Sequence, residues 1–467
     1  MSDASSWDKL FSAIMINGSI SAGIEGWKMA LRTHYTSEVT EGDAGKEVTV
    51  AGWVHKLRDL GKLKFIVLRD RGGQIQVTLK KGVSDDALIS LADSLREEDV
   101  IAVTGTVKAT AIAPKRREIS PRRIDVLNRI VQSVPVSVSG KIESNLDTRL
   151  DFRVLDLRRP EVSAVFSIQS KLIEGFQEYL KREGFKQIFT PCLMGAASES
   201  GAEVFPVVYF NKSAFLRQDP QLHRQLAVIS GMDKIYDLGP SWRAELSHTP
   251  RHLCEHRGCA VELGFIKDEG EVMRVEEGLV VSGLAKVKEE CKEELEILGK
   301  DVVIPPTPFP EIRFPDVYSI LEELGKKVPY GEDYDRESEA LLAGYVKERF
   351  KSDFFFVNRF PFKVKPFYVM RVDEDPTWAR SVDMICKGLE LSSGGQRENR
   401  YSKIMDQVKE KGMSAVSVQW FTEFFKYGAP THGGFNIGIE RLTMQLLDLP
   451  NIREATLFPR TPDRLLP

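Results

Sequence analysis

The sequence predicts an α+β protein in which a small β-barrel precedes a larger domain built on an antiparallel sheet flanked by helices. Three observations predict this class. Residues 46–128 divide into short strand-like runs, residues 162–183 open a region that mixes strands with long helices, and the 467 residues are 42% hydrophobic and 28% charged. Such a composition is that of an ordinary globular protein, and the length favours two to four domains. Strand runs followed by helix runs favour the α+β class.

The barrel is predicted from five strand-like runs with one helix between the third and the fourth. The turn Asp70-Arg71-Gly72-Gly73 joins two of these runs as a hairpin. Five strands with one interposed helix are typical of a small barrel such as the OB-fold. The expected strands are 47–54, 64–69, 74–79, 99–107 and 122–127, and the expected helix is 84–96.

One hairpin of this barrel is rich in cations and aromatic residues. They are Lys56, Arg58, Lys62, Lys64, Arg69 and Arg71, interleaved with Trp53, His55 and Phe65. Cations can meet phosphates while bases stack on aromatic rings, a pattern typical of single-stranded nucleic-acid binding. From the residues alone, a solvated charged hairpin with two core aromatics is the favoured interpretation.

The remainder of the chain is expected to form the second domain. Its helices are predicted at 162–183, 269–298, 317–325 and 335–350, and its strands at 187–190, 353–357, 367–371 and 388–392. We expect a flexible tail over 1–28, the barrel over 29–133, a hinge over 134–161 and the second domain over 162–467. Met29 could also be the functional start of the chain.

Two arginine-acid motifs carry the chemistry. In the segment His432–Arg441, glycines suited to a close-approach loop precede Glu440-Arg441 and an apolar helix over 442–449. About two hundred residues earlier, Trp242–Glu245 begins a strand, loop and returning strand. Arg243 could bridge a substrate carboxylate and an α-phosphate, with Arg251 and His252 reaching the distal phosphates. The alternative is a surface hairpin with a salt bridge.

Bulk properties restrict the possible functions. The net charge of −3 does not indicate general nucleic-acid binding, and no apolar run approaches the ~18 residues of a membrane span. Five irregularly spaced cysteines fit a reducing, cytoplasmic compartment. His248, His252, Cys254, His256 and Cys259 lie within twelve residues and leave a zinc site as a minor alternative.

Taken together, these motifs resemble the class II aminoacyl-tRNA synthetases, in particular the aspartyl family of archaeal and eukaryotic type. The match runs from Met29 to Pro467 and includes the ending Asn451–Arg460. The resemblance implies an OB-fold that reads the anticodon and a homodimer built through the helix 162–183, its strand and Pro191. It also implies activation of aspartate by ATP with Mg²⁺, followed by transfer to tRNA.

The resemblance also implies roles for individual residues. Arg243 and Arg441 would be the catalytic arginines, on the α- and γ-phosphates. ATP would be bound by Arg243, Glu245, Arg251, His252, Glu390, Gly438 and Arg441, and Mg²⁺ by Glu390 and Ser393. The amino acid would be bound by Glu199, Gln221, Arg224, Arg243, Ser393 and Arg397, and the tRNA anticodon by His55, Phe65 and Gln76. A planar arginine fork at Arg397 would favour a carboxylate over an amide.

Among the departures from the family pattern, four are expected to matter at the amino-acid pocket. Asp219 stands for a serine, Arg224 for a lysine, Ala260 for an aspartate near the α-amino group, and Asn436 for a glycine. Asp219 would be unfavourable beside an anionic substrate if it faces the pocket. The Asn436 side chain could crowd the ligand, or its backbone could adopt a positive φ. The hypotheses are a working aspartate enzyme with a retuned pocket, a paralogue for asparagine or another small acid, and a tRNA-binding protein without catalysis. His55 after Trp53-Val54, with Pro114 in a later loop, predicts that tRNA(Asn) is also accepted.

Overall fold

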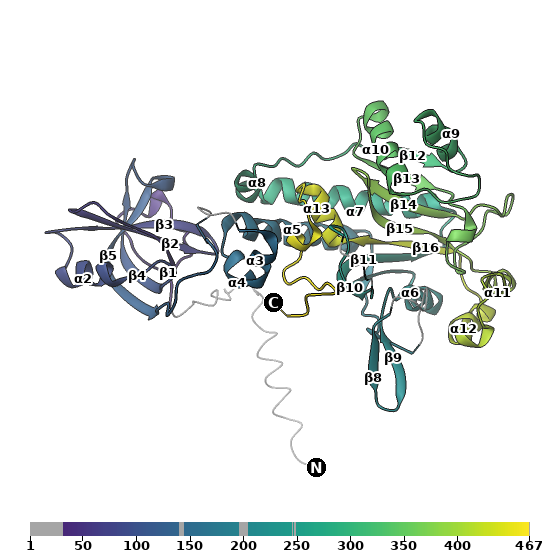
Figure 1. Cartoon of the computed structure of the whole chain (residues 1–467), viewed down its shortest axis with the longest axis horizontal. Helices are drawn as coiled ribbons and strands as arrows, with labels where there is room; N and C mark the ends of the chain where they lie inside the picture. The colour runs from purple at the N-terminus through teal and green to yellow at the C-terminus, as the bar shows by residue number, and fades with distance from the viewer. Residues whose placement is uncertain (1–30, 140–143, 196–203, 245, 247–248, 467) are drawn as a thin grey trace, which may run out of the picture. The chain divides into compact units, whose positions relative to one another are not determined.

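The computed structural model describes residues 31–139, 144–195, 204–244, 246 and 249–466. The chain divides into two compact units, Met1–Glu143 and Ser144–Pro467, which are described separately (Figure 1). The expected tail at 1–28 lies outside the described residues, and so do Glu199, Glu245 and His248.

The described part of the N-terminal unit is a closed barrel with the strand order β1-β2-β3-β5-β4. Alternate residues such as Ile66 and Leu68 are buried inside it, as a strand period of two requires. The predicted OB-fold, its five strands and its helix are therefore confirmed. The elements are β1 (Glu47–Asp59), β2 (Leu63–Asp70), β3 (Gly73–Lys80), α2 (Asp86–Ser94), β4 (Val100–Ala109) and β5 (Arg117–Asn128).

The C-terminal unit is built on a sheet that has eight strands within the described residues, in the order β12-β13-β14-β15-β16-β11-β10-β6. The six strands from β13 to β10 pair antiparallel, whereas the two edge strands pair parallel with their neighbours. The strands are β6 (Lys186–Gln187), β10 (Lys234–Trp242), β11 (Glu255–Gly264), β12 (Glu311–Arg313), β13 (Phe354–Asn358), β14 (Ser381–Cys386), β15 (Leu389–Arg397) and β16 (His432–Gly438).

Helices and a small second sheet complete this unit. The second sheet consists of β7 (Leu193–Met194), β8 (Pro206–Tyr209) and β9 (Lys212–Leu216). The helices are α3 (Leu146–Asp151), α4 (Arg153–Asp156), α5 (Pro160–Arg182), α6 (Gln221–Ala227), α7 (Glu269–Glu290), α8 (Lys292–Leu298), α9 (Asp316–Glu323), α10 (Arg336–Phe350), α11 (Tyr401–Glu410), α12 (Ala415–Thr422) and α13 (Ile439–Leu446).

The glycine-rich segment was predicted as a loop before a helix at 442–449, and that prediction is wrong. It is β16, a central strand, and α13 begins directly after it at Ile439. The neighbouring strand β11 is so close to β16 here that a Cβ on Gly434 would lie 2.1 Å from the carbonyl oxygen of Val261. The glycine therefore makes room for a neighbouring strand, not for a ligand.

The predicted strand at 367–371 is also absent. Val369 and Arg371 form only isolated bridges, to Arg397 and Ala379. Pro366 has no backbone N–H to donate to a strand ladder, and the segment after it is irregular. β13 pairs with β12 on one side and with β14 on the other, and neither β12 nor β14 was predicted from the sequence. Helices α3 and α4 lie within the segment predicted as a hinge.

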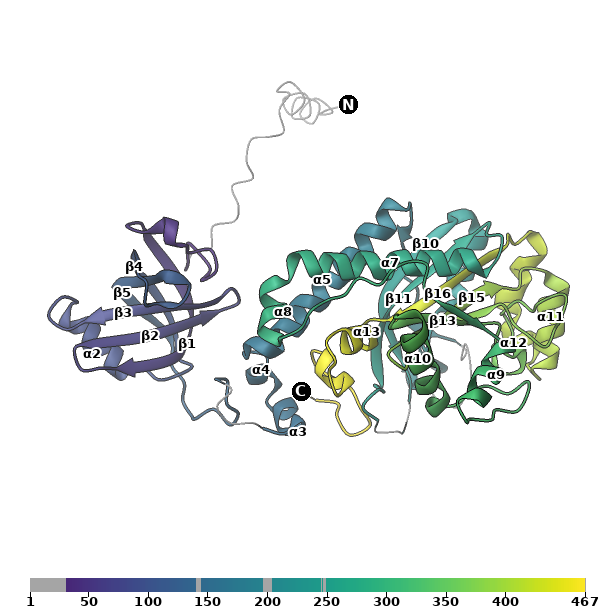
Figure 2. The same ribbon diagram turned by 90° about the horizontal axis from the view of Figure 1, so that it is seen from above.

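Helices cover one face of the large sheet. α5 and α7 lie side by side along it, and α13 packs on the same layer (Figure 2). Strand residues of one parity, such as Val261, Phe435 and Ile437, point into this core. Residues of the other parity point to the opposite face, where the functional cavity lies.

One carboxyl group is buried in the helical layer behind this face. Glu276 on α7 is 1% exposed and accepts a hydrogen bond from the Ser392 hydroxyl. Burial raises the pKa of Glu276 to about 8 from the usual 4.5. The folded chain therefore binds this proton more tightly than the unfolded chain, and stability is lost as pH rises from about 4.5 to about 8.

Glu276→Gln is therefore expected to gain stability over the natural chain as the pH rises. Between pH 5.5 and pH 8 the gain should grow by about 2–3 kcal/mol, from ~1.4 kcal/mol per pH unit of linkage. Urea unfolding at both pH values measures it. The control is Glu178→Gln, because the Glu178 side chain is 56% exposed and should show no such trend. A pH-independent difference for Glu276→Gln would contradict the assignment.

Candidate functional site

A cavity of about 390 Å³ opens on the face of the large sheet opposite α5 and α7. The predicted residues that line it are Gln221, Arg243, Arg251, His252, Glu390, Ser393, Arg397, Gly438 and Arg441. A second cavity of about 190 Å³ adjoins it and shares Arg251, His252, Glu390 and Arg441. Arg224 is fully buried and does not line either cavity. The structure thus brings most of the predicted site together.

One end of the cavity is strongly cationic. Arg243 directly follows β10, and Arg251 lies in the loop after it. Arg441 is the third residue of α13. His256, which the sequence analysis did not assign to the site, also lines this end. Burial, together with Arg243 and Arg441, lowers the pKa of His256 to about 4. His256 is therefore neutral, and the positive charge at this end comes from the arginines. A polyanionic ligand would neutralise that charge.

Two carboxylates face this cationic end. Asp383 on β14 and Glu390 on β15 both line the cavity, and Arg441 Nη1 donates to the Glu390 carbonyl at 2.9 Å and to its carboxylate at 3.3 Å. Asp383 accepts from the Ser393 hydroxyl at 2.6 Å and from Lys365 at 2.9 Å. Burial and then the Asp383 charge raise the pKa of Glu390. Asp383 was missed because β14 was not predicted.

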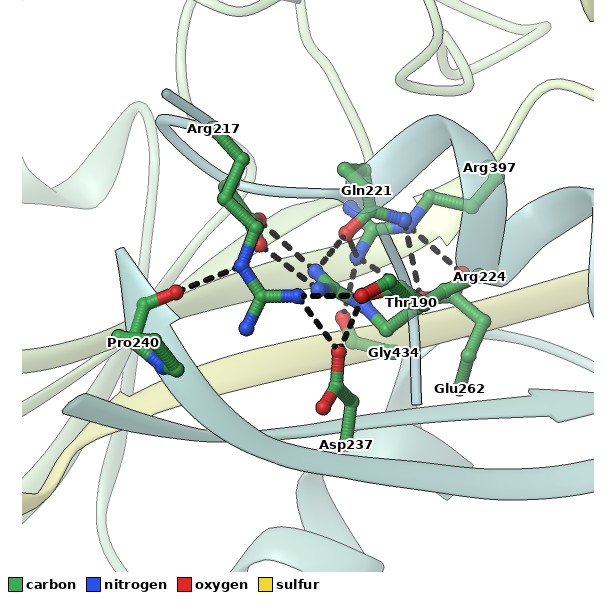
Figure 3. A network of polar contacts seen from close by, with 10 residues as sticks. Thr190, Arg217, Gln221, Arg224, Asp237, Pro240, Glu262, Arg397 and Gly434 are labelled. Atoms are coloured by element: carbon green, nitrogen blue, oxygen red, sulfur yellow. Dashed lines mark hydrogen bonds and ion pairs between the residues drawn. The ribbon is translucent and has the colours of Figure 1, made fainter. Parts of the chain in front are cut away.

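The opposite end of the cavity holds a buried hydrogen-bond network (Figure 3). Arg397 Nε and Nη2 donate to Glu262 at 3.0 and 3.4 Å, and Nη2 also reaches Gln221 Oε1 at 3.1 Å and the Gly434 carbonyl at 2.9 Å. Gln221 in turn donates to Glu262 at 2.9 Å. Arg397 Nη1 has no hydrogen-bond partner in the part of the chain that the structure describes. The guanidinium is thus held in place with one nitrogen left for a ligand.

Asp219 and Arg224, two of the four departures from the family pattern, form an ion pair with each other. Arg224 Nη1 and Nη2 donate to the two Asp219 oxygens at 2.7 and 2.8 Å, and Nη2 also donates to Gln221 at 2.8 Å. Burial alone would raise the pKa of Asp219, but Arg224 outweighs it and the pKa is lowered. The expected repulsion between Asp219 and an anionic substrate is therefore offset inside the protein.

A third buried arginine, Arg217, which the sequence analysis did not single out, lies beside this network (Figure 3). Arg217 Nε donates to the Pro240 carbonyl at 2.6 Å, and Nη1 contacts Thr190 Oγ1 at 2.6 Å and Asp237 at 3.2 Å. It ties the end of β9 to β10. No sequence signal marks it, because its acid partner lies twenty residues away on another strand.

Asn436 and Ala260, the other two departures, are direct cross-strand partners on β16 and β11. Asn436 has extended backbone within β16, so the alternative of a positive φ is wrong, and the residue lines the cavity. Its Oδ1 is buried without a hydrogen-bond partner in the described residues, against Gly258. A Cβ on Gly258 would lie 2.1 Å from that oxygen, so the glycine makes room for the amide.

On the barrel, the three residues predicted to bind the anticodon fall on β1, β2 and β3. Phe65 is half-buried opposite Thr78, and Gln76 is next along the same face, opposite Val67. Gln76 Nε2 donates to Glu118 at 3.0 Å. His55 lies at a β-bulge of β1 and contacts Arg69 at 2.9 Å. Aromatic and hydrogen-bonding groups thus share one barrel surface.

The described residues contain no cluster of three histidine, cysteine or acidic side chains that could hold a metal ion. Cys254 and Cys259 are buried, Cys259 in the core beside α5 and α7. The minor zinc alternative therefore gains no support here. No helix in the described part of the chain is long and apolar enough to cross a membrane.

The fold and the cavity define the class of protein. A domain built on a largely antiparallel sheet carries a cavity lined by several arginines, and the same chain contains an OB-fold barrel. A family model described as tRNA synthetases class II (D, K and N) matches residues 145–462, and one for an OB-fold nucleic acid binding domain matches residues 48–127. The chain belongs to the class II tRNA synthetases of this D, K and N family.

Relatives across the whole chain agree. The chain is 45% identical to an aspartate--tRNA(Asp) ligase of Thermococcus kodakarensis, over 93% of this chain and 100% of the relative. It is 44% identical to an aspartate--tRNA(Asp/Asn) ligase of Aeropyrum pernix, over 91% and 97%. The crystal structure of asparaginyl-tRNA synthetase from Pyrococcus horikoshii with asparaginyl-adenylate superposes with a TM-score of 0.87 at 33% identity, covering 94% and 100% of the chains.

Proposed function

We propose that the chain activates aspartate with ATP as the aspartyl-adenylate and transfers it to tRNA(Asp), and also to tRNA(Asn). The names of the similar ligases support this proposal. The observation that carries it is that one cavity is lined by Arg243 and Arg441, which we assign to the ATP phosphates, and by the fixed guanidinium of Arg397. The alternatives of an asparagine-activating paralogue or a non-catalytic binding protein are not favoured by these similarities.

The amino acid is proposed to bind at the buried network. Arg397 offers Nη1 to the substrate side-chain carboxylate while Glu262 and Gln221 fix the rest of the guanidinium. Because Glu262 already accepts from Arg397, the network orients the guanidinium before the substrate arrives. Gln221 contributes to the same wall, and Arg224 acts on the substrate only through Gln221.

ATP is proposed to bind at the cationic end. Arg243 neutralises the α-phosphate and substrate carboxylate where the new bond forms, and Arg441, Arg251 and His252 hold the distal phosphates. Gly438 lines this end and has space around it, since a Cβ there would approach no atom closer than 3.6 Å.

The donor set around Asp383 and Glu390 fits Mg²⁺. Two carboxylates and the Ser393 hydroxyl are oxygen ligands, the type that Mg²⁺ prefers. Burial and then the Asp383 charge raise the pKa of Glu390, and a bound cation would offset the repulsion between the two acids. When bound, Mg²⁺ would supply charge neutralisation to the ATP phosphates. We therefore add Asp383 to the predicted ligands Glu390 and Ser393.

Asp383→Asn tests this metal assignment. The variant is expected to require about tenfold more Mg²⁺ for half-maximal aspartate-dependent ATP–pyrophosphate exchange, since it removes one charged ligand. Exchange rates measured over a Mg²⁺ titration give the result. The control is Asp373→Asn, whose side chain is 50% exposed and pairs with Arg400 outside the cavity. An unchanged Mg²⁺ requirement would exclude Asp383 as a ligand.

The tRNA is proposed to bind at the barrel surface that carries His55, Phe65 and Gln76, where a base stacks on Phe65 and the Gln76 amide meets a base edge. We also propose a homodimer through α5 and its following strand, and a cytoplasmic location, which the five free cysteines fit.

Aspartylation of tRNA transcripts tests the proposed function. Radiolabelled aspartate should be attached to tRNA(Asp), and to tRNA(Asn) with kcat/KM within about tenfold. If tRNA(Asn) accepts no aspartate while tRNA(Asp) does, the chain is specific for tRNA(Asp) and the tRNA(Asn) part of the proposal is wrong. If neither transcript is charged, the proposal fails.

A further inference from the structure

The ring of His55 is held by a buried ion pair. Arg69 Nη1 lies 2.9 Å from His55 Nδ1, and Arg69 Nη2 donates to both carboxylate oxygens of Glu98 at 3.0 Å. Arg69 and Glu98 are 4% and 7% exposed, whereas His55 is half-buried. The guanidinium therefore lies between a fixed carboxylate and the imidazole.

The backbone around His55 is shaped to make this contact. The β1–β2 register shifts between Val54 and Lys56, which places His55 at a β-bulge, a device that re-aims a side chain. Glu98 has a φ of 73°, uncommon for a residue with a side chain. Glu98 N donates to Val54 O at 2.6 Å, and Val54 N donates to the carbonyl of the next residue, Asp99, at 2.8 Å. The bulge and the strained residue thus meet directly.

The chemistry of arginine decides the state of His55. A guanidinium has only N–H donors and stays charged, so the atom it meets must be an acceptor. His55 Nδ1 must then carry no hydrogen, and the single ring hydrogen sits on Nε2. Burial and the Arg69 charge also lower the pKa of His55, which agrees with a neutral ring.

We infer that Arg69 and Glu98 are positioning residues that lock His55 as the neutral Nε2–H tautomer, so that it presents one fixed hydrogen-bond donor to a base of the tRNA anticodon. This inference rests on the proposed function of the barrel surface. A fixed donor requires an acceptor on the base, such as uracil O4 or cytosine N3. A ring free to change tautomer would set no such requirement.

The experiment uses the full-length chain labelled with ¹⁵N-histidine, with His55→Gln to assign the His55 signals. The natural chain should show an unprotonated Nδ1 and a protonated Nε2 at neutral pH. Arg69→Lys keeps the charge but not the fork, and Glu98→Gln keeps Arg69 but weakens its anchor. Both should give mixed tautomers and lower kcat/KM for tRNA(Asp) by about 3–10-fold, as expected for one misplaced hydrogen bond.

The matched control is Arg123→Lys, because Arg123 pairs with Asp125 on the same barrel with its side chain 72% exposed. It should change neither the spectrum nor the charging of tRNA. A protonated Nδ1 in the natural chain would overturn the inference, and so would unchanged tautomers in both variants. Aspartate-dependent ATP–pyrophosphate exchange should be the same in every variant, and its absence in the natural chain would count against the proposed function instead.

Discussion

Arg243→Ala is expected to lower the rate of aspartate-dependent ATP–pyrophosphate exchange by about 10²–10³-fold, the usual effect of removing one group that stabilises charge in a transition state. Arg243 lines the cavity at its cationic end and its side chain is exposed there. Removing it should therefore take away transition-state stabilisation without disturbing the core. The thermal unfolding midpoint should stay within about 2 °C.

The control for this prediction is Arg257→Ala. Arg257 lies on β11, the strand paired with β10, and its side chain is 51% exposed, but it does not line the cavity. Its exchange rate should stay within about twofold of the natural chain. If Arg243→Ala retained more than about a tenth of the natural rate, Arg243 would not be the arginine on the reacting phosphate.

Asp219→Ala is expected to destabilise the chain by about 3 kcal/mol, because it leaves the fully buried Arg224 guanidinium without its partner. The KM for aspartate should rise as well, since Arg224 also holds Gln221, which lines the cavity. Replacing both residues, as in Asp219→Ser with Arg224→Lys, should recover most of the stability and lower KM again. Urea unfolding and pyrophosphate exchange give the two readouts.

A double-mutant cycle decides whether the two residues act as a pair. Coupling of at least about 1 kcal/mol between positions 219 and 224 is expected for contacting charges. The matched control pair is Arg371 and Glu410, an ion pair whose carboxylate side chain is 51% exposed, which should show coupling below about 1 kcal/mol. Strictly additive effects at 219 and 224 would mean that the two departures from the family pattern arose independently of each other.

The barrel was predictable because its signal is local. Alternating residues such as Ile66 and Leu68 mark strands whose inner face is buried, and the turn at Gly72-Gly73 joins two of them. The cavity arginines were predictable in the same way, because Arg243 and Arg441 stand in motifs whose residues are close in sequence.

Features that depend on strand pairing were not predictable. Asp383 faces Ser393 only through the register of β14 with β15. The glycines of β16 look like a ligand loop until the neighbouring carbonyl of Val261 is placed against them. In the sequence, Asp219 and Arg224 look like two unrelated departures from the family pattern. The structure shows that the start of α6 brings them into contact, so that each balances the other's charge.

We propose that this cavity activates aspartate. Amino-acid-dependent ATP–pyrophosphate exchange across the twenty amino acids distinguishes this function from its alternatives. Aspartate should support exchange with kcat/KM at least about 10³-fold above asparagine, the discrimination available when the wrong side chain leaves a buried charge unpaired. Exchange that is fastest with asparagine or another amino acid, or that no amino acid supports, would contradict the account.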